Sequence, residues 1–416
     1  MFQNHPLFIL AGNGSYCNRG CEAILRGTVF ILRQHFNQPH FLAVSSYKNE
    51  EQYNEQRKNE KDSAIVHKTM YNRYRKFSFP WCLSKTLWFL YPNALRHIIY
   101  KDLKPSLHEA QAVLALGGDN YSLALSGLKR LPITCLQLDE LVISQGKPLV
   151  IWGASVGPFD KFPAGERYMT KHLRKVHILA RETVTIEYLE KIGLTENVHQ
   201  VADPAFLMRP IKPPSEEYQE IEPGNIGLNL SPLMKDYATK GDLSQWQNLA
   251  AAIIHNILEK TKRRIYLIPH VTGMPWNDDY LFMQKVISLM PELKKKVVLV
   301  PPVFNAAETK WIIGQMEMFV GARMHSTIAS YSMRIPTINL AYSIKAEGLS
   351  KDIYNHNDYC IMPQDLKPDR VADKVAEILR EAKYHRRYLS QRISKMEDMS
   401  LQAGEILQGI LRNSSC

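Results

Sequence analysis

The chain has 416 residues, of which 45% are hydrophobic and 22% are charged. This length excludes a single small module and favours two domains, and the composition excludes an extensively disordered protein. Lysine and arginine (52) outnumber aspartate and glutamate (41), so the formal net charge is +11. That excess favours an anionic partner, which could be nucleic acid, a membrane surface or a phosphorylated and carboxylated small molecule.

Six cysteines are spread along the chain, and none of them forms a CxxC pair of the kind found in zinc and redox sites. Few and scattered cysteines indicate a reduced, cytoplasmic protein. The start of the sequence, MFQNHPLFIL, has no basic region followed by a long apolar run, so we expect a first strand there and no secretory signal. The most apolar stretches are under half of the ~20 residues that a membrane-spanning helix needs.

The N-terminal half alternates short apolar runs with amphipathic stretches, a pattern typical of parallel α/β structure. We predict strands at about 6–12, 40–45, 111–116, 148–153 and 177–180, and helices at about 20–36, 134–145, 164–175 and 183–192. A Pro-rich, charged stretch at 209–225 then interrupts the pattern. We therefore place the first Rossmann-like domain at residues 1–215.

The second half repeats the alternation and predicts another Rossmann-like domain at 222–367, followed by terminal helices at 368–416. Its predicted strands lie at about 225–230, 264–269, 297–300, 318–321 and 336–341, and its helices at about 243–260, 277–290, 306–315, 325–333 and 345–351. The predicted fold class is therefore α/β with two Rossmann-like domains.

Residues 68–104 depart from this pattern, because they carry eight Lys or Arg residues against the single acid Asp102, interleaved with aromatics such as Trp81 and Trp88. Basic and aromatic residues together suit a membrane headgroup interface or a lid over an anionic substrate. A helical insertion that packs its aromatic side chains on the domain would have the same composition.

Two glycine motifs follow predicted strands of the first domain. AGNGSYCNRG (11–20) contains Asn13 and Asn18, which could contact a ligand beside exposed backbone amides or cap a turn. LALGGDNYS (114–122) contains Asp119 and Asn120 where a parallel strand ends, which is where ligands bind in open α/β sheets. Asp119 could act there as a general base or serve as a helix cap.

Four further candidates follow other strands. Arg181 comes after the strand at 177–180, where it could bind a carboxylate or phosphate or pair with Glu182. His270 ends IYLIPH as either a ligand or a structural histidine. Arg323 and His325 open a helix after the strand at 318–321, so a permanent cation and a titratable ring share a positive helix end. That pair predicts an anion site with an acid beside it, and the alternative is a capped helix with a buried histidine.

Taken in order, the motifs GNGSYCNRGCEAIL, LGGDNYS, WGASVGPF, ARETVTIEYL, VADPAFLM, GLNLSP, LIPHVTG and GARMHSTIAS through AYSIKAEG resemble the polysaccharide pyruvyl transferase family along residues of about 8–354. The resemblance implies two domains facing across a cleft, as in GT-B glycosyltransferases. In many members an acid follows the glycine that occupies position 20 here, whereas this chain has Cys21.

The resemblance also implies a reaction, in which the pyruvyl group of phosphoenolpyruvate becomes a ketal on a pair of sugar hydroxyls. The expected roles are His325 as the acid, Asp119 as the base, Arg323, Arg181 and His270 as phosphoenolpyruvate ligands, and Asn13, Asn18 and Asn120 as acceptor ligands. This chemistry demands no metal and no cofactor. The expected acceptor is a glycan or a lipid-linked oligosaccharide, and residues 68–104 would bring the enzyme to the anionic inner face of the plasma membrane.

Two other functions fit parts of the sequence. A nucleotide-sugar-dependent glycosyltransferase of GT-B type would have the same two domains and a basic site. A protein that binds anionic membranes without catalysis would use the positive charge alone. Nucleic-acid binding is not expected, because the sequence contains no helix-turn-helix, zinc-finger or RNP-like pattern.

Overall fold

The computed structural model describes residues 5–70, 100–122, 133–214, 221–341 and 344–414. The chain divides into two compact units, each built around a parallel sheet. Unit 1 comprises Met1–Ser15, Thr28–Asp203 and Met399–Cys416, and unit 2 comprises Tyr16–Gly27 and Pro204–Asp398. Within these described ranges the structure confirms the predicted α/β class.

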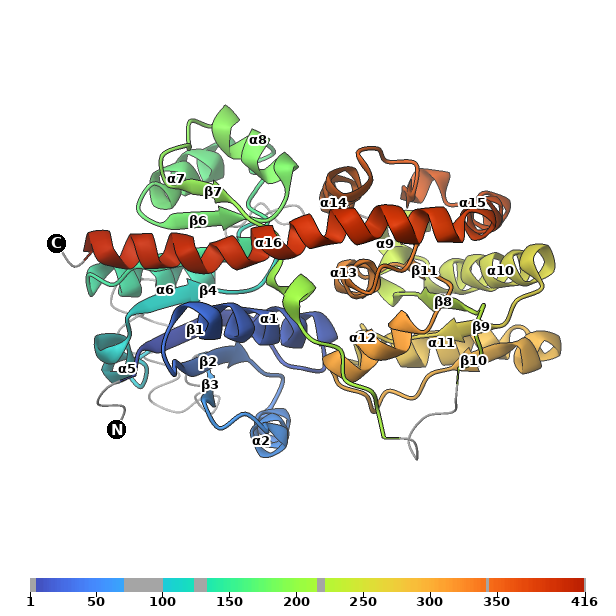
Figure 1. The fold of residues 1–416 in the computed structure, drawn as a ribbon, viewed down its shortest axis with the longest axis horizontal. Helices are drawn as coiled ribbons and strands as arrows, with labels where there is room; N and C mark the ends of the chain where they lie inside the picture. The colour runs from blue at the N-terminus through green and yellow to red at the C-terminus, as the bar shows by residue number, and fades with distance from the viewer. Residues whose placement is uncertain (1–4, 71–99, 123–132, 215–220, 342–343, 415–416) are drawn as a thin grey trace. The chain divides into compact units, whose positions relative to one another are not determined.

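The sheet of unit 1 has seven strands in the order β3-β2-β1-β4-β5-β6-β7, and Figure 1 shows helices against it. All its strand pairs are parallel, and the central strands β1, β4 and β5 are largely buried apolar runs, as expected for a parallel sheet covered on both faces. The strands are β1 (Leu7–Gly14), β2 (His40–Ser46), β3 (Ile65–Thr69), β4 (Ala112–Ala115), β5 (Leu149–Ala154), β6 (His177–Ala180) and β7 (Val198–Gln200).

Helices lie between these strands along the chain. The side chain of Asn49 caps one of them, α2, by accepting a hydrogen bond from the backbone N–H of Gln52 at 2.9 Å. The helices are α1 (Arg19–His35), α2 (Glu50–Asn59), α5 (Lys104–Glu109), α6 (Ile133–Ser144), α7 (Pro163–Leu173) and α8 (Thr183–Lys191). The first turns of α1, as far as Gly27, belong to unit 2.

The sheet of unit 2 has six parallel strands in the order β10-β9-β8-β11-β12-β13. The strands are β8 (Ile226–Asn229), β9 (Ile265–Leu267), β10 (Val297–Leu299), β11 (Met318–Gly321), β12 (Thr337–Leu340) and β13 (Cys360–Ile361). The α-helices are α9 (Lys235–Ala238), α10 (Leu243–Thr261), α11 (Asp279–Ser288), α12 (Ala306–Gly314), α13 (Met324–Ser332), α14 (Ile344–Tyr354), α15 (Pro368–Arg380) and α16 (Ala382–Ser414).

Side-chain caps fix where several helices of unit 2 begin. Asp242 accepts a hydrogen bond from Gln245 N at the start of α10, and Asp278 accepts one from Leu281 N at the start of α11. Asn305 and Glu308 form a capping box that begins α12. Short 3₁₀ helices lie at η1 (Pro204–Leu207), η2 (Pro232–Met234), η3 (Pro291–Lys296) and η4 (Pro363–Asp365).

Each sheet contains one point at which the strand order reverses. In unit 1 the chain builds β2 and β3 on one side of β1 and then places β4 on the other side. In unit 2 it builds β9 and β10 on one side of β8 and then places β11 on the other. Ligands of open α/β sheets bind outside the carboxyl ends of the strands at such points.

The division into units differs from the sequence-based domains in two places. The first is the boundary, which falls between Asp203 and Pro204 rather than within the Pro-rich stretch that follows. The second is the terminal segment, because α16 contributes residues as far as Asp398 to unit 2 and residues from Met399 onward to unit 1. Ser400 donates a hydrogen bond to the carbonyl of Asp203, and Gln408 donates one to the carbonyl of His35, which ties the end of the chain to unit 1.

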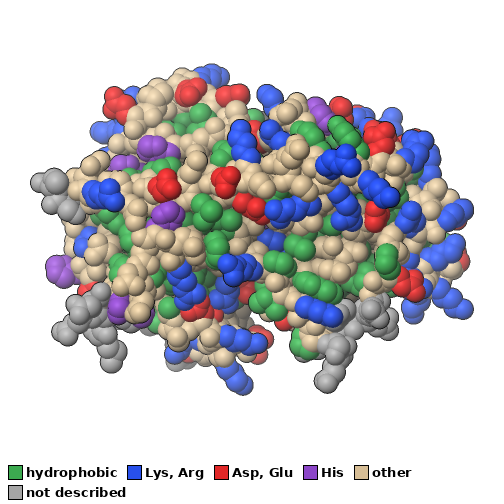
Figure 2. All heavy atoms as spheres, viewed as in Figure 1, with side chains coloured by type: hydrophobic (Ala, Val, Ile, Leu, Met, Phe, Trp, Pro, Cys, Tyr) green, Lys and Arg blue, Asp and Glu red, His purple; other side chains and the backbone are tan. Residues whose placement is uncertain are grey.

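Most of the basic aromatic segment expected at 68–104, including Trp81 and Trp88, lies outside the described residues. On the face drawn in Figure 2, Lys and Arg side chains gather most densely where α10 and α15 lie, with acidic side chains among them. None of the helices in the described ranges combines the length and the apolar composition that a bilayer crossing requires.

Gly27 of α1 provides a test of packing within unit 2. A Cβ atom added at Gly27 would lie 1.8 Å from the carbonyl oxygen of Pro204, whereas one added at Gly409 of α16 would have nothing within 4 Å among the described residues. Overpacking costs about 1–3 kcal/mol or more. Alanine in an open helical site stabilises by roughly 0.5–1 kcal/mol relative to glycine.

We therefore expect Gly27→Ala to lower the midpoint of thermal unfolding, followed by circular dichroism, and the matched variant Gly409→Ala to raise it. A Gly27→Ala protein as stable as wild type would contradict the contact between α1 and η1.

Candidate functional site

The candidate site of unit 2 lies at its strand-order reversal. Asn229 ends β8, His270 follows β9 and Arg323 follows β11, and these three strands are neighbours in the sheet. Their carboxyl ends therefore bring an amide, an imidazole and a guanidinium to one edge. His270 and Arg323 were both expected at a ligand site, and the structure brings them together.

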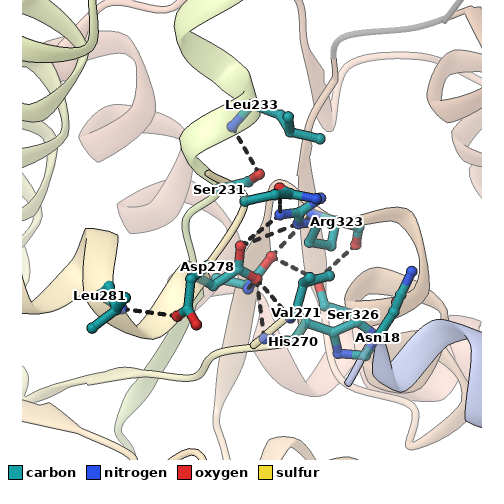
Figure 3. A network of polar contacts seen from close by, with 12 residues as sticks. Asn18, Ser231, Leu233, His270, Val271, Asp278, Leu281, Arg323 and Ser326 are labelled. Carbon is teal, nitrogen blue, oxygen red and sulfur yellow. Dashed lines mark hydrogen bonds and ion pairs between the residues drawn. The ribbon is translucent and has the colours of Figure 1, made fainter. Parts of the chain in front are cut away.

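Asp279 is the first residue of α11 and connects the polar groups at this edge. Figure 3 shows His270, Val271 and Arg323 of this polar network. The side chain of Asp279 is 0% exposed. One carboxylate oxygen, Oδ2, accepts hydrogen bonds from the backbone N–H of His270 (3.1 Å), the backbone N–H of Val271 (3.0 Å) and Nδ2 of Asn229 (3.1 Å). The other, Oδ1, accepts from Nη2 (2.8 Å) and Nε (3.2 Å) of Arg323. A buried carboxylate with this many donors is fixed in position.

Arg323 is held on several sides. Besides its ion pair with Asp279, it donates from Nη2 to the side-chain oxygen of Asn277, and its backbone N–H donates to Oδ1 of Asn229 at 3.0 Å. None of the described residues accepts a hydrogen bond from the remaining terminal nitrogen, Nη1. The guanidinium is therefore preorganised, with one terminal nitrogen left for a ligand.

His270 is buried, and within the described part of the chain neither of its ring nitrogens has a hydrogen-bond partner. Buried polar atoms without partners are rare in proteins, so the ring of His270 is a candidate for binding a ligand. Burial is the main cause that lowers the pKa of His270 well below its ordinary value, and electrostatic interactions with His325, Arg19 and Arg323 act in the same direction. The ring is therefore neutral near pH 7, with one nitrogen that donates and one that accepts.

His325 lies in the first turn of α13, directly after Arg323 and Met324. The start of α1 approaches it closely, since a Cβ atom added at Gly20 would lie 2.7 Å from Cγ of the His325 ring. Because both helix N-termini carry partial positive charge, they favour an anion beside this ring. Any side chain at position 20 would have to displace the ring.

Arg19, which the sequence analysis did not single out, adds a further cation to this site. Its Nη1 donates to the carbonyl of Tyr16 at 2.6 Å, its Nη2 donates to the carbonyl of Pro302 at 3.0 Å, and its backbone N–H donates to the carbonyl of His270 at 3.0 Å. Burial lowers the pKa of this guanidinium. The site in unit 2 thus combines two arginines, two histidines and two helix N-termini around one paired carboxylate, which is an environment for an anion.

In unit 1, the glycine motifs meet at the reversal between β1 and β4. Nδ2 of Asn120 donates to the carbonyls of Gly12 and Leu116, each at 2.7 Å. Gly12 and Gly117 have φ angles of +87° and +102°, a region that favours glycine. Asn120 therefore joins the two loops. The side chain of the adjacent Asp119 is 46% exposed.

Arg181 contacts the loop of Asp119, since its Nη2 donates to the carbonyl of Gly118 at 3.4 Å, and it is surrounded by carboxylates. Its Nε donates to Glu182 at 2.6 Å and its Nη1 to Asp203 at 2.6 Å, while Nη2 lies 3.9 Å from an oxygen of Asp119. Burial acts to lower the pKa of this guanidinium, but the surrounding carboxylates outweigh it and raise the pKa. Direct binding of the donor by Arg181 stays a prediction, and it requires that a carboxylate partner move.

The remaining expected ligands are divided between the units. Asn13, in β1 of unit 1, is buried and accepts a hydrogen bond from the N–H of Gly14 at 3.1 Å. Asn18, in unit 2, precedes α1 and accepts one from the N–H of Gly20 at 3.0 Å, as a helix cap does. Cys21 lies in the first turn of α1, so it occupies the helix start that approaches His325.

Sequence reasoning missed Asp279, Asn277 and Asn229. A signal was present, since GLNLSP places Asn229 at a strand end and WNDDY places three polar residues at a helix start. Within the described residues, no group of three or more His, Cys, Asp or Glu side chains is placed to hold a metal ion.

The two units are similar to those of known nucleotide-sugar enzymes. The UDP-GlcNAc 2-epimerase of Neisseria meningitidis, solved with UDP-GlcNAc, aligns over 98% of this chain and 100% of its own with a TM-score of 0.60 and 11% identity. A UDP-glucosyltransferase from Polygonum tinctorium aligns over 99% of both chains with a TM-score of 0.59 and 11% identity. These similarities define the fold, which is GT-B-like.

The family follows from the sequence match. The model for polysaccharide pyruvyl transferases matches residues 18–344, so the chain belongs to that family. A curated relative, the amylovoran biosynthesis protein AmsJ of Erwinia amylovora, is 23% identical over 366 residues, which cover 83% of this chain and 85% of AmsJ. The match to the family model contains all the site residues of unit 2 described above.

The lowered pKa of His270 predicts a pH dependence of stability. As pH falls, the unfolded chain takes up a proton at this histidine near its ordinary pKa of about 6.5, before the folded protein does. The contribution of His270 to stability is therefore complete above about pH 6.5 and is lost progressively below it.

We expect the midpoint of thermal unfolding to fall more steeply between about pH 7 and pH 5 in the wild type than in His270→Asn, as measured by calorimetry. Equal slopes in the two proteins would contradict a buried, neutral His270.

Proposed function

We propose that the protein transfers the pyruvyl group of phosphoenolpyruvate to two hydroxyls of a glycan, as a ketal, during polysaccharide biosynthesis. One observation carries the proposal: in a member of this family, the strand ends of unit 2 bring together an arginine fixed by an ion pair and a buried histidine whose ring nitrogens have no hydrogen-bond partner among the described residues. Phosphoenolpyruvate has the carboxylate and phosphate that such a site favours. The relation to an amylovoran biosynthesis protein supports a glycan as acceptor.

In this proposal the donor binds to unit 2. Nη1 of Arg323 donates to an oxygen of the donor, and Asp279 keeps the guanidinium in place for that contact. The neutral ring of His270 donates a second hydrogen bond, so it recognises the anion without adding a full charge. Arg19 and the N-termini of α1 and α13 supply the positive potential that opposes the growing charge on the departing phosphate.

His325 is the proposed acid. A proton from its ring goes to the methylene carbon of phosphoenolpyruvate, which leaves the neighbouring carbon electron-poor and open to attack by the first sugar hydroxyl. The second hydroxyl then replaces phosphate at the same carbon. The two hydroxyls release two protons. One returns to His325 and the other leaves on the inorganic phosphate, so the products are the ketal and hydrogen phosphate.

Asp119 of unit 1 is the proposed base for the acceptor hydroxyls. Its carboxylate is exposed. Its loop is held by hydrogen bonds from Asn120 to the carbonyl of Gly12 and from Arg181 to the carbonyl of Gly118. We propose that Asn13, Asn18 and Asn120 contribute to acceptor binding through the loops that they hold. Contact with the inner face of the plasma membrane through residues 68–104 remains part of the proposal.

Mass spectrometry of candidate glycan acceptors tests the reaction directly. Incubation with phosphoenolpyruvate is expected to add one pyruvyl ketal to an acceptor and to release inorganic phosphate. The control replaces phosphoenolpyruvate with UDP-sugars, because the fold is shared with enzymes that use them. Sugar addition from a UDP-sugar, without a ketal from phosphoenolpyruvate, would show a glycosyltransferase instead.

Replacing Arg323 and replacing His325 are expected to affect different steps, donor binding in the first case and turnover in the second. Arg323→Ala removes the proposed donor contact and leaves Asp279 buried without its cation, so we expect weak phosphoenolpyruvate binding. His325→Ala removes the acid, so we expect turnover to fall by about 10²–10⁴-fold with donor affinity nearly unchanged.

Phosphate release gives turnover, and calorimetric titration with phosphoenolpyruvate gives affinity. Circular dichroism of each variant controls for folding. Full turnover in a folded His325→Ala protein would refute its assignment as the acid.

A further inference from the structure

An exposed tryptophan lies on the loop that leads from β9 to α11. Trp276 is 71% exposed, and Gly273 and Pro275 beside it are also exposed. The next residues along the chain, Asn277 and Asp278, are buried together with Asp279. The loop therefore has an exposed aromatic tip, Trp276, and a buried polar base, by which we mean Asn277, Asp278 and Asp279.

That base holds the loop in a fixed shape. The backbone N–H of Gly273 donates to Oδ2 of Asp278 at 2.6 Å, and the N–H of Asn277 donates to the carbonyl of Met274 at 2.7 Å. The φ angle of Gly273 is +72°, and Pro275 restricts the chain further. A rigid loop that keeps a large aromatic side chain in water pre-arranges it for a ligand at small entropic cost.

The tip also adjoins the donor site. Asn277, the residue after Trp276, accepts a hydrogen bond from Nη2 of Arg323. Consecutive Cα atoms are about 3.8 Å apart, so the backbone of Trp276 is within one residue of a direct contact of Arg323. A molecule that reacts with an anion held at Arg323 would extend over this loop.

We propose that Trp276 is a stacking platform for a pyranose ring of the acceptor glycan, a role that rests on the proposed pyruvyl transfer. A pyranose has an apolar C–H face that packs on an indole ring and a rim of hydroxyls that suits polar surroundings. The base of the loop offers such surroundings. Among the exposed large apolar side chains of the described residues, Leu281, 51% exposed in the first turn of α11, is the nearest to Trp276 along the chain. A protein partner would need a contiguous apolar patch of several hundred Å² or more.

Quenching of tryptophan fluorescence by acrylamide tests the platform without requiring turnover. The probes are the methyl glycosides of galactose, glucose, mannose and N-acetylglucosamine, each added with and without phosphoenolpyruvate. Trp152 and Trp246 are fully buried and contribute little to quenching. The difference between wild type and Trp276→Phe isolates the signal of Trp276.

At least one glycoside is expected to protect the wild type from quenching. Calorimetry with that glycoside should show about ten-fold weaker binding in Trp276→Ala and a smaller loss in Trp276→Phe, which keeps an aromatic face. Leu289→Ala is the matched control, because Leu289 is 40% exposed at the opposite end of α11. Its affinity for the glycoside should equal that of the wild type.

Two results would overturn the platform: protection by none of the glycosides in a protein that binds phosphoenolpyruvate, or equal glycoside affinity in wild type and Trp276→Ala. Failure of the proposed reaction gives a different result. In that case a glycoside protects Trp276, but no phosphate is released from phosphoenolpyruvate with any acceptor.

Discussion

The carboxylate of Asp279 is the feature on which the site in unit 2 depends. It connects the loop after β9 to Arg323 after β11, because one oxygen accepts backbone N–H groups of the loop and the other accepts the guanidinium. Removing one partner from a buried pair of this kind costs about 3–5 kcal/mol, since the other is left as an uncompensated charge. The pair thus fixes both geometry and charge: the guanidinium is held in place by Asp279, and the carboxylate largely balances its positive charge.

Arg181 in unit 1 is a second buried arginine that is paired with carboxylates, and its surroundings differ from those of Arg323. Its partners surround the guanidinium on several sides and raise its pKa. Arg323 is left with one terminal nitrogen and a neutral histidine beside it. Two arginines that look alike in the sequence, each following a strand, therefore have different surroundings. For this reason our proposal assigns the anion to Arg323 and not to Arg181.

The sequence was sufficient to predict the two parallel sheets, because the fully buried strands are continuous apolar runs and the glycine motifs follow them. It also predicted that His270, Arg323 and His325 follow strands, and these positions determine the edge of the sheet at which they lie. Their roles stay predictions. Asp279 was missed because two of its partners, Arg323 and Asn229, lie 44 and 50 residues away from it in the sequence. No local sequence pattern shows such a pairing. The sequence likewise did not predict that α16 contributes to both units. Its hydrogen bonds from Ser400 and Gln408 go to carbonyls that are far away in the sequence.

The most direct test of this account is a crystal structure of the protein with phosphoenolpyruvate bound. We expect an oxygen of the ligand within hydrogen-bond distance of Nη1 of Arg323, a second contact from a ring nitrogen of His270, and the methylene carbon next to the ring of His325. The ion pair between Arg323 and Asp279 should be unchanged. A ligand bound instead to Arg181, with Asp203 displaced, would contradict the assignment of the donor site to unit 2.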